Sequence, residues 1–181
     1  QKDVLQIACI AEKGSEHPLA EAMLTKAKNN KIPVPEAKNI QAIPGHGIIA
    51  LWGLKKIFVG TRKLMKDNKI QASKESEDIL LKLENQGKTA VLVGLNKEII
   101  GIIAVADTIK ENSLKAVQEL KKLGKEVYMI TGDNERTALA IAKQTGINSV
   151  LAEVLPGKKA EEIKKLQEKG KIVAMVGDGI N

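Results

Sequence analysis

The pattern of the sequence changes near residue 107, and this change limits the folds that the chain can adopt. Before it, short strand-like runs are joined by tight turns at Pro44-Gly45, Trp52-Gly53 and Asn96. Turns of this kind join neighbouring antiparallel strands. After it, strand-like and helix-like segments alternate, and strands separated by helices pair in parallel. We therefore expect an α/β chain of two domains, formed by residues 1–106 and 107–181.

The first domain is predicted to be an α+β structure with an antiparallel sheet. Apolar side chains recur at helical spacing over residues 4–11, 19–27 and 79–83, and the last of these helices stops at Gly87. The expected strands cover residues 38–43, 47–51, 56–60, 89–95 and 98–106. Helices that bracket hairpin-linked strands favour a sheet with its helices on one face.

The second domain is predicted to be a partial, doubly wound parallel sheet. Its helices are expected at residues 112–123, from 134 to about 144, and at 158–169. The expected strands cover residues 126–130, 149–152 and 172–176. The last is a continuous apolar run, typical of a strand that is buried on both faces. Because only three short strands are present, we expect the sheet to be incomplete.

Composition excludes several classes of protein. Apolar stretches such as residues 99–106 are far shorter than the roughly 20 residues that span a bilayer. One cysteine rules out an internal disulfide, and with only two histidines a zinc site is disfavoured. The net charge of +7 is compatible with an anionic ligand, but the lysines are dispersed along helices beside glutamates. With 2% aromatic residues, a nucleic-acid-binding module is the least favoured reading.

Two acidic loops follow strands of the predicted parallel sheet. They are Thr131-Gly132-Asp133-Asn134 and Gly177-Asp178-Gly179-Ile180-Asn181. In an open α/β sheet, ligands bind beyond the carboxyl ends of the strands. A single Gly-Asp pair is usually just a turn. Two of them in one sheet favour a site where a carboxylate holds Mg²⁺ and a hydroxyl binds a phosphoryl oxygen.

These motifs are similar to those of a known family. Thr131-Gly132-Asp133, Lys159 after Pro156, and Gly177-Asp178-Gly179-Ile180-Asn181 resemble the phosphorylation domain of P-type ATPases, which belongs to the haloacid-dehalogenase-like superfamily. Ser15-Glu16-His17-Pro18-Leu19, with Gly45-His46-Gly47 downstream, resembles the nucleotide-binding domain of the heavy-metal (P1B) subgroup. Within that subgroup the sequence looks most like the copper(I) exporters, with zinc/cadmium pumps as the alternative.

The resemblance implies an adenine-binding site in the first domain. Glu12 would accept a hydrogen bond from the exocyclic amine of adenine, and His17 would pack against the base and hydrogen-bond to it. The residues that would let the backbone approach the nucleotide and line its pocket are Gly45, Gly47, Ile48 and Gly60. Valine at position 47 is expected to block ATP without unfolding the domain, provided that φ is negative. Thr61 stands where asparagine is common in the family, so no side-chain amide is offered there.

The resemblance also implies phosphate chemistry in the second domain. Asp107 and Lys110 would form an acidic and basic pair at the hinge, near the ribose and phosphates. Thr131 would bind the transferred phosphoryl group in a loop completed by Gly132 and Asp133. Lys159 would neutralise the charge of that group, and Asp178 would ligate Mg²⁺.

The nucleophile of the family, the aspartate of Asp-Lys-Thr-Gly-Thr, does not occur in this sequence. We therefore expect a fragment from the cytoplasmic side of a multi-pass membrane pump, without membrane insertion of its own. It would bind ATP and Mg²⁺ and present the γ-phosphate to an aspartate elsewhere in the parent. Alone, it would not turn over by the aspartyl-phosphate route. Its partners would be the remaining phosphorylation, actuator and transmembrane domains. The alternative, a soluble phosphatase of the same superfamily, would lack the adenine-binding residues.

Overall fold

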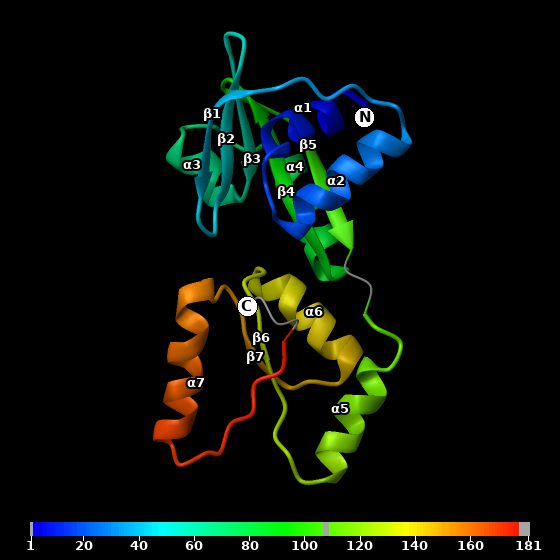
Figure 1. The fold of residues 1–181 in the computed structure, drawn as a ribbon, viewed down its shortest axis with the longest axis vertical. Coiled ribbons are helices and arrows are strands. Elements are labelled where there is room, and N and C mark those ends of the chain that lie inside the picture. Colours follow the sequence, from blue (N-terminus) through cyan, green and yellow to red (C-terminus); the bar gives the residue numbers. More distant parts are fainter. Residues whose placement is uncertain (1, 107–108, 178–181) are drawn as a thin grey trace. The chain divides into compact units, whose positions relative to one another are not determined.

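The computed structural model describes residues 2–106 and 109–177. The chain divides into two compact units, Gln1–Thr108 (unit 1) and Ile109–Asn181 (unit 2), which are drawn in Figure 1. Within the described ranges, no helix is both long enough and apolar enough to cross a membrane. The fold is a mixed α/β structure, as expected, with a five-stranded antiparallel sheet and a smaller parallel one.

Unit 1 is built on a meander of five antiparallel strands in the order β1-β2-β3-β4-β5. The strands are β1 (Lys38–Ile43), β2 (Gly47–Trp52), β3 (Lys55–Gly60), β4 (Lys88–Leu95) and β5 (Glu98–Ala106). The helices are α1 (Lys2–Glu12), α2 (Pro18–Asn29), α3 (Arg62–Asp67) and α4 (Lys74–Asn85). Every strand and all but one helix of this unit were predicted, and the unpredicted helix is α3.

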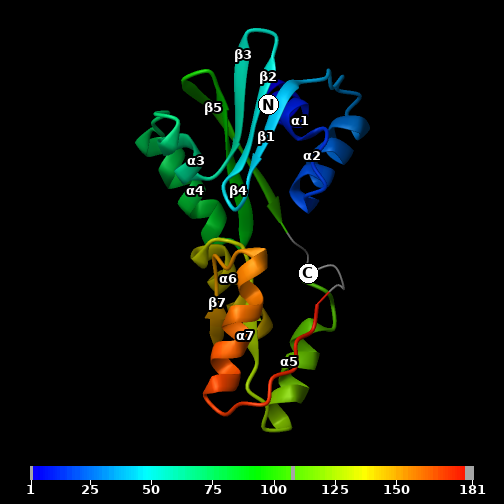
Figure 2. The same ribbon diagram turned by 60° about the vertical axis from the view of Figure 1, so that its left-hand side comes forward.

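Helices cover both faces of this sheet, so the expectation of helices on one face is wrong. Successive side chains of a strand point to opposite faces. Ile48 and Ala50 of β2 pack in one buried cluster with α1 and α2, whereas Ile49 packs in a second cluster with Leu64 of α3 and Leu80 of α4. Figures 1 and 2 show α1 and α2 on one side of the strands and α3 and α4 on the other. Because both faces are covered, the sheet forms the centre of a three-layered unit.

Unit 2 alternates helices and short strands. Its elements are α5 (Ser113–Lys122), β6 (Tyr128–Ile130), α6 (Glu135–Thr145), β7 (Ser149–Leu151), the 3₁₀ turn η1 (Pro156–Lys158) and α7 (Lys159–Glu168). The strands β6 and β7 pair in parallel, with Tyr128 opposite Ser149 and Ile130 opposite Leu151. The connection between them is α6, so this part of the prediction of a parallel β-α-β arrangement is confirmed.

The strand predicted for residues 172–176 is not formed. Residues 171–177 pair with no strand among the described residues, and Ile172 and Val176 are 104% and 95% exposed. Lys171 pairs with Glu126 and lies 5.8 Å from the centre of the Tyr128 ring, which places the start of this segment beside β6. A run of apolar residues indicates that a segment tends to be buried. A β-strand also needs a neighbouring strand to pair with its backbone N–H and C=O groups.

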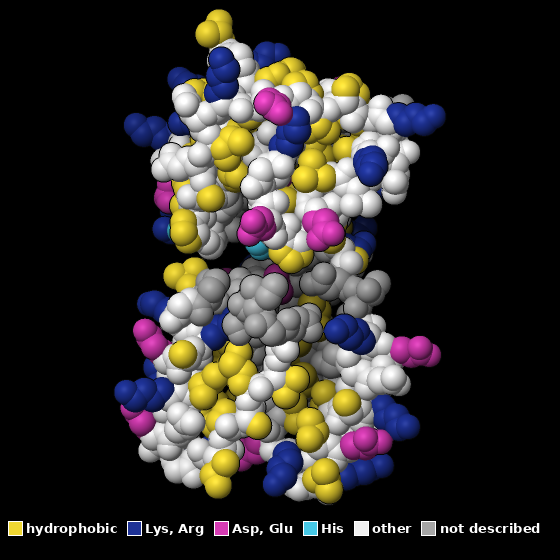
Figure 3. Space-filling view, in the orientation of Figure 1, with side chains coloured by type: hydrophobic (Ala, Val, Ile, Leu, Met, Phe, Trp, Pro, Cys, Tyr) yellow, Lys and Arg dark blue, Asp and Glu magenta, His cyan; other side chains and the backbone are white. Residues whose placement is uncertain are grey.

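Unit 2 exposes many large apolar side chains. Besides Ile172 and Val176 they include Leu114, Leu120, Leu123, Leu139, Leu155 and Met175. Figure 3 shows apolar side chains gathered between α7 and α5 on the visible face of this unit. By contrast, the largest fully buried side chains lie mostly in unit 1.

Hydrogen exchange is expected to be fastest in unit 2. Amides of residues 172–176 should exchange at nearly the rate of an unfolded peptide, because they pair with no strand in the described structure. Amides of residues 91–93 should be the most protected, since β4 lies between β3 and β5 and its side chains are buried. Exchange followed by mass spectrometry or NMR on a monomeric sample tests this order. Equal protection of the two segments would contradict the expected order.

Candidate functional site

The loop between α1 and α2 holds Glu12 and His17 in defined positions. The backbone N–H of Ser15 donates to the Glu12 carbonyl at 2.9 Å, which turns the chain at the end of α1. His17 is the N-cap of α2: its Nδ1 accepts a hydrogen bond from the Leu19 N–H at 3.1 Å. Pro18 occupies the first helical position, where its missing N–H costs nothing. Because Nδ1 accepts, the neutral ring carries its hydrogen on Nε2.

Glu12 is a buried carboxylate, with only 6% of its surface exposed. Burial raises its pKa, whereas hydrogen bonding from the Ser15 side chain and the nearby His17 lower it. One turn earlier in α1, the fully buried Cys9 has its pKa raised to about 11, by burial and by Glu12. A buried carboxylate beside a hydroxyl group and an imidazole is suited to recognising a hydrogen-bond donor on a ligand.

The turn between β1 and β2 depends on glycines at positions 45 and 47. Their φ angles are +72° and +131°, values that side chains rarely adopt. A Cβ at Gly47 would also lie 2.1 Å from the Val59 carbonyl oxygen and 2.6 Å from the Gly60 Cα. The expectation that the domain tolerates valine at Gly47 is therefore wrong. The pairing of β2 with β3 requires this glycine whether or not a ligand binds.

Gly60 and Thr61 join this turn to the other side of the sheet. A Cβ at Gly60 would lie 2.1 Å from the His46 carbonyl oxygen, which accepts a hydrogen bond from the Thr61 N–H at 2.8 Å. Thr61 is the N-cap of α3, since its hydroxyl accepts from the Leu64 N–H at 3.4 Å. Threonine at this position thus has a structural role.

The structure brings the predicted adenine-binding residues of unit 1 to one end of that unit. Both views show the α1–α2 loop, which carries His17, at the same end as the β1–β2 turn, which carries Gly45 and Gly47 (Figures 1 and 2). Ile48, the second residue of β2, is buried in the cluster that contains Ala8 and Ala11 of α1. Helix α1 and the start of β2 therefore pack together under the two loops.

In unit 2, the loop after β6 is tied together by Thr131 and Asp133. The Thr131 hydroxyl donates to the Asp133 carboxylate at 2.8 Å and accepts from the Asp133 N–H at 3.1 Å. The Asp133 carbonyl accepts from the Glu153 N–H, which connects the loop to the segment after β7. A Cβ at Gly132 would meet only the Val154 carbonyl oxygen, at 3.5 Å. Packing alone therefore does not require glycine at position 132.

Of the other four predicted phosphate-site residues, the structure describes two, Lys159 and Lys110. Lys159 is the first residue of α7 and is half-buried, and Lys110 is exposed ahead of α5. Asp107 and Asp178 lie outside the described residues. The structure therefore assembles the Thr131–Asp133 loop and places Lys159 at the start of α7.

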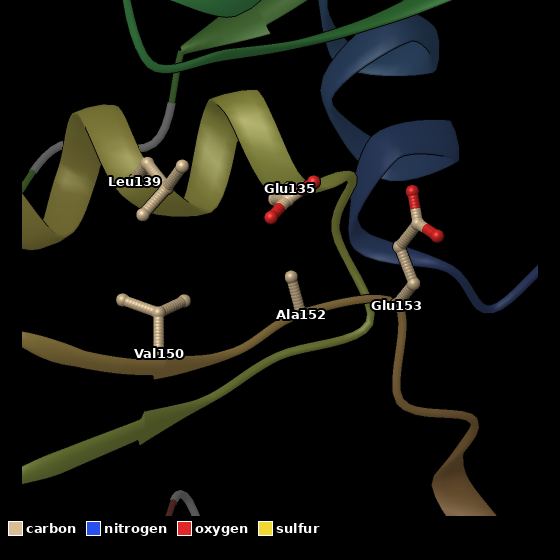
Figure 4. A pocket seen from close by; sticks show the side chains of 5 residues that line it. All are labelled: Glu135, Leu139, Val150, Ala152 and Glu153. Carbon is tan, nitrogen blue, oxygen red and sulfur yellow. The ribbon is translucent and has the colours of Figure 1, made fainter.

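Two cavities lie apart from the predicted adenine-binding residues. One, of about 150 Å³, lies between α6 and β7, where Leu139 and Val150 face each other and Glu135 and Glu153 stand at its polar end (Figure 4). It is smaller than the roughly 300 Å³ at which ligand pockets begin. The other, of about 520 Å³, lies in unit 1 among residues of α3, α4 and β4. Neither includes the predicted adenine-binding residues.

Sequence reasoning missed the part that Ser15 plays in this site. The Ser15 hydroxyl accepts a hydrogen bond from the His17 N–H at 3.3 Å, and hydrogen bonding from it lowers the pKa of Glu12. A serine two residues ahead of a helix N-cap is a local signal for such a turn, because serine often bonds to a backbone N–H two residues on.

Comparison with known proteins gives the family of the chain. The family model for haloacid dehalogenase-like hydrolases matches residues 2–181. The chain belongs to the haloacid dehalogenase-like hydrolase family. This agrees with the parallel strands β6 and β7 and the acidic loop that follows β6.

This haloacid dehalogenase-like chain is similar to part of an ion pump. It is 51% identical over 177 residues to a copper-exporting P-type ATPase of Staphylococcus aureus (strain JH9), an alignment that covers 98% of the chain and 22% of that protein. The chain thus spans about a fifth of the length of this curated relative.

Solved structures of related proteins show the same arrangement. A zinc-transporting PIB-type ATPase in its E2.Pi state is 33% identical, with a TM-score of 0.60 over 99% of this chain and 28% of that one. The catalytic domain of the CPx-ATPase CopB-B is 25% identical, with a TM-score of 0.69 over 99% of this chain and 62% of that one. The N-domain of HMA8, a copper-transporting P-type ATPase, is 30% identical, with a TM-score of 0.50 over 58% of this chain and 89% of that one. The resemblance to the P1B subgroup is confirmed.

Proposed function

We propose that this chain is the ATP-binding part of a heavy-metal-translocating P-type ATPase, with copper(I) as the transported ion. Unit 1 is assigned as the nucleotide-binding domain and unit 2 as part of the phosphorylation domain. The proposal is carried by the placement of the Glu12–His17 loop and the Gly45–Gly47 turn at one end of unit 1. Copper is preferred to zinc because the relative with 51% identity is copper-exporting, whereas the zinc-transporting structure is 33% identical.

Base recognition follows from the chemistry of the loop. The Glu12 carboxylate is proposed to accept from the exocyclic amine of adenine, and the His17 ring to pack against the base. Guanine carries a carbonyl oxygen at the corresponding position, which would face the carboxylate without a proton between them. This arrangement therefore favours ATP over GTP. A soluble phosphatase of the same superfamily would show no such preference.

Phosphate handling is assigned to unit 2. The Thr131 hydroxyl is proposed to turn from Asp133 to a phosphoryl oxygen, and the Lys159 ammonium to offset the charge of the phosphates. The γ-phosphate would pass to an aspartate that is not in this sequence. The carboxylate of Asp133 is the kind of hard oxygen ligand that Mg²⁺ takes, but no group of three or more acidic, His or Cys side chains in the described ranges could hold a metal ion. The proposal of Asp178 as the Mg²⁺ ligand therefore rests on the resemblance.

Replacement of His17 by asparagine is expected to weaken ATP binding about tenfold or more. Asparagine can accept the Leu19 N–H as the imidazole does, so the cap of α2 is kept while the ring that packs on adenine is lost. Isothermal titration calorimetry with ATP measures the change, and circular dichroism checks that the fold is retained.

His46→Asn is the matched control, because His46 is the other histidine of the chain and lies in the β1–β2 turn. The hydrogen bond described for His46 is made by its backbone carbonyl, which accepts from the Thr61 N–H, so ATP affinity should stay unchanged in this variant. GTP should bind the unaltered chain more weakly than ATP. Equal affinity for the two nucleotides, or equal losses in the two histidine variants, would show that the assigned base recognition is wrong.

A further inference from the structure

The Ser15 hydroxyl interacts with both residues that are proposed to contact adenine, with the backbone of His17 and the side chain of Glu12. It accepts the His17 N–H at 3.3 Å, and hydrogen bonding from it lowers the pKa of the Glu12 carboxyl group. The Ser15 N–H donates to the Glu12 carbonyl at 2.9 Å, so the residue is tied to Glu12 through both its backbone and its side chain. A single hydroxyl can play both parts, since it offers one donor and two acceptor sites.

The surroundings of Glu12 offer few other groups to hold it in place. The side chains of β2 and β3 that pack with α1 in this core are apolar, among them Ile48, Ile57 and Val59. The titratable group that acts on Glu12 is His17, which favours the carboxylate, while Glu12 and burial together raise the pKa of the Cys9 thiol one turn earlier. Lys13 is engaged with Glu36 at 3.2 Å. Burial opposes ionisation of Glu12, and the Ser15 hydroxyl acts against that effect.

We propose that Ser15 is a positioning residue for adenine recognition, because its hydroxyl holds the Glu12 side chain and the His17 backbone in one arrangement. The inference rests on the proposed function, since it assigns a role within the same site. Ser15 acts through Glu12 and His17 and makes no contact with the nucleotide. A loop that is ordered before binding loses less freedom when the ligand arrives, so this tie increases affinity without adding a contact.

The first test compares Ser15→Ala with Ser15→Thr. Alanine removes the hydroxyl, and ATP affinity should fall about tenfold, the loss typical of a hydrogen bond to a charged group. Threonine keeps a hydroxyl at the same atom and should restore most of the affinity. Calorimetry on both variants and on the unaltered chain measures this difference, and thermal unfolding checks that unit 1 remains folded.

The second test follows the pH dependence of binding, which loss of a purely structural contact would not move. The hydroxyl lowers the pKa of Glu12, so its removal should raise that pKa further. Binding that needs the carboxylate weakens as pH falls through this pKa, so the midpoint should move to higher pH in Ser15→Ala. Adenosine is the ligand to use, because it has no phosphate that titrates in the same range. Carbon-13 NMR of the Glu12 carboxyl group reports its pKa directly in each variant.

The outcomes separate this inference from the proposed function. If the unaltered chain binds neither ATP nor adenosine, the proposed function is wrong and the inference falls with it. If it binds both, while Ser15→Ala keeps the same affinity and the same Glu12 pKa, the positioning role is wrong and the proposed function stands. A tenfold loss that Ser15→Thr restores, together with the shifted midpoint, supports the inference.

Discussion

Replacement of Gly47 by alanine is expected to destabilise unit 1 by about 3–5 kcal/mol. The φ of +131° is unfavourable for any side chain, and the new Cβ would lie 2.1 Å from a backbone oxygen of β3. Strands β2 and β3 would have to separate, since backbone atoms cannot move aside as a flexible side chain can. A loss of this size is a large part of the stability of an ordinary domain. Urea denaturation followed by the fluorescence of Trp52, the single tryptophan of the chain, measures it.

Gly53→Ala separates the strain of a positive φ from the contact of the new Cβ with β3. Gly53 also has a positive φ, of +60°, but a Cβ there would meet nothing within 4 Å. Alanine at this position should cost about 1 kcal/mol, the strain of a left-handed backbone alone. If the Gly47 and Gly53 variants lose equal stability, the contact with Val59 is not the reason that glycine occupies position 47.

Replacement of Arg62 by alanine is expected to cost about 2–3 kcal/mol of stability. The guanidinium bonds to both carboxylate oxygens of Glu84, whose side chain is 1% exposed, and to Glu77 at 2.6 Å. Without Arg62, the buried Glu84 carboxylate would lose the two hydrogen bonds that the guanidinium donates to it. The expected loss of stability is smaller than for a fully buried ion pair because the Arg62 side chain is 35% exposed, and solvent screens part of the interaction.

Glu77→Ala is the matched control, because it removes the exposed partner of the same guanidinium. Its side chain is 36% exposed, so the expected loss is below about 1 kcal/mol. Replacement of both Arg62 and Glu84 by leucine should cost less stability than Arg62→Ala, since the buried carboxylate is removed together with the guanidinium that binds it. Equal losses for Arg62→Ala and Glu77→Ala would mean that burial of Glu84 does not set the cost.

Most of unit 1 could be predicted from the sequence because its signals are local. Tight turns at Pro44-Gly45 and Trp52-Gly53 set the hairpins, and side chains at helical spacing mark α1, α2 and α4. Helix α3 was missed since its 6 residues are too few to show a period, and its start depends on the Thr61 cap. Helices α3 and α4 cover the second face of the sheet, so the prediction that helices lie on one face only was wrong.

Features that depend on contacts between distant segments could not be predicted from the sequence pattern. The need for glycine at position 47 arises from Val59 and Gly60 on the neighbouring strand, so no local motif could separate it from a ligand contact. Residues 172–176 have the composition of a buried strand, yet composition does not state whether a neighbouring strand is there to pair with. The roles of Glu12 and His17 could be predicted from the resemblance. The hydrogen bond from the His17 N–H to the Ser15 hydroxyl depends on side-chain geometry, which the sequence does not give.

The order of the strands in unit 1 has a consequence for how the chain is made. Each strand of the meander pairs with the strand just before or just after it in sequence. Contacts of this kind close short loops, which favours rapid folding. Because synthesis proceeds from the N-terminus, the sheet can grow on the ribosome one strand at a time against α1 and α2, which emerge first. The part proposed to hold the base can therefore be complete before the part proposed to handle the phosphate has been translated.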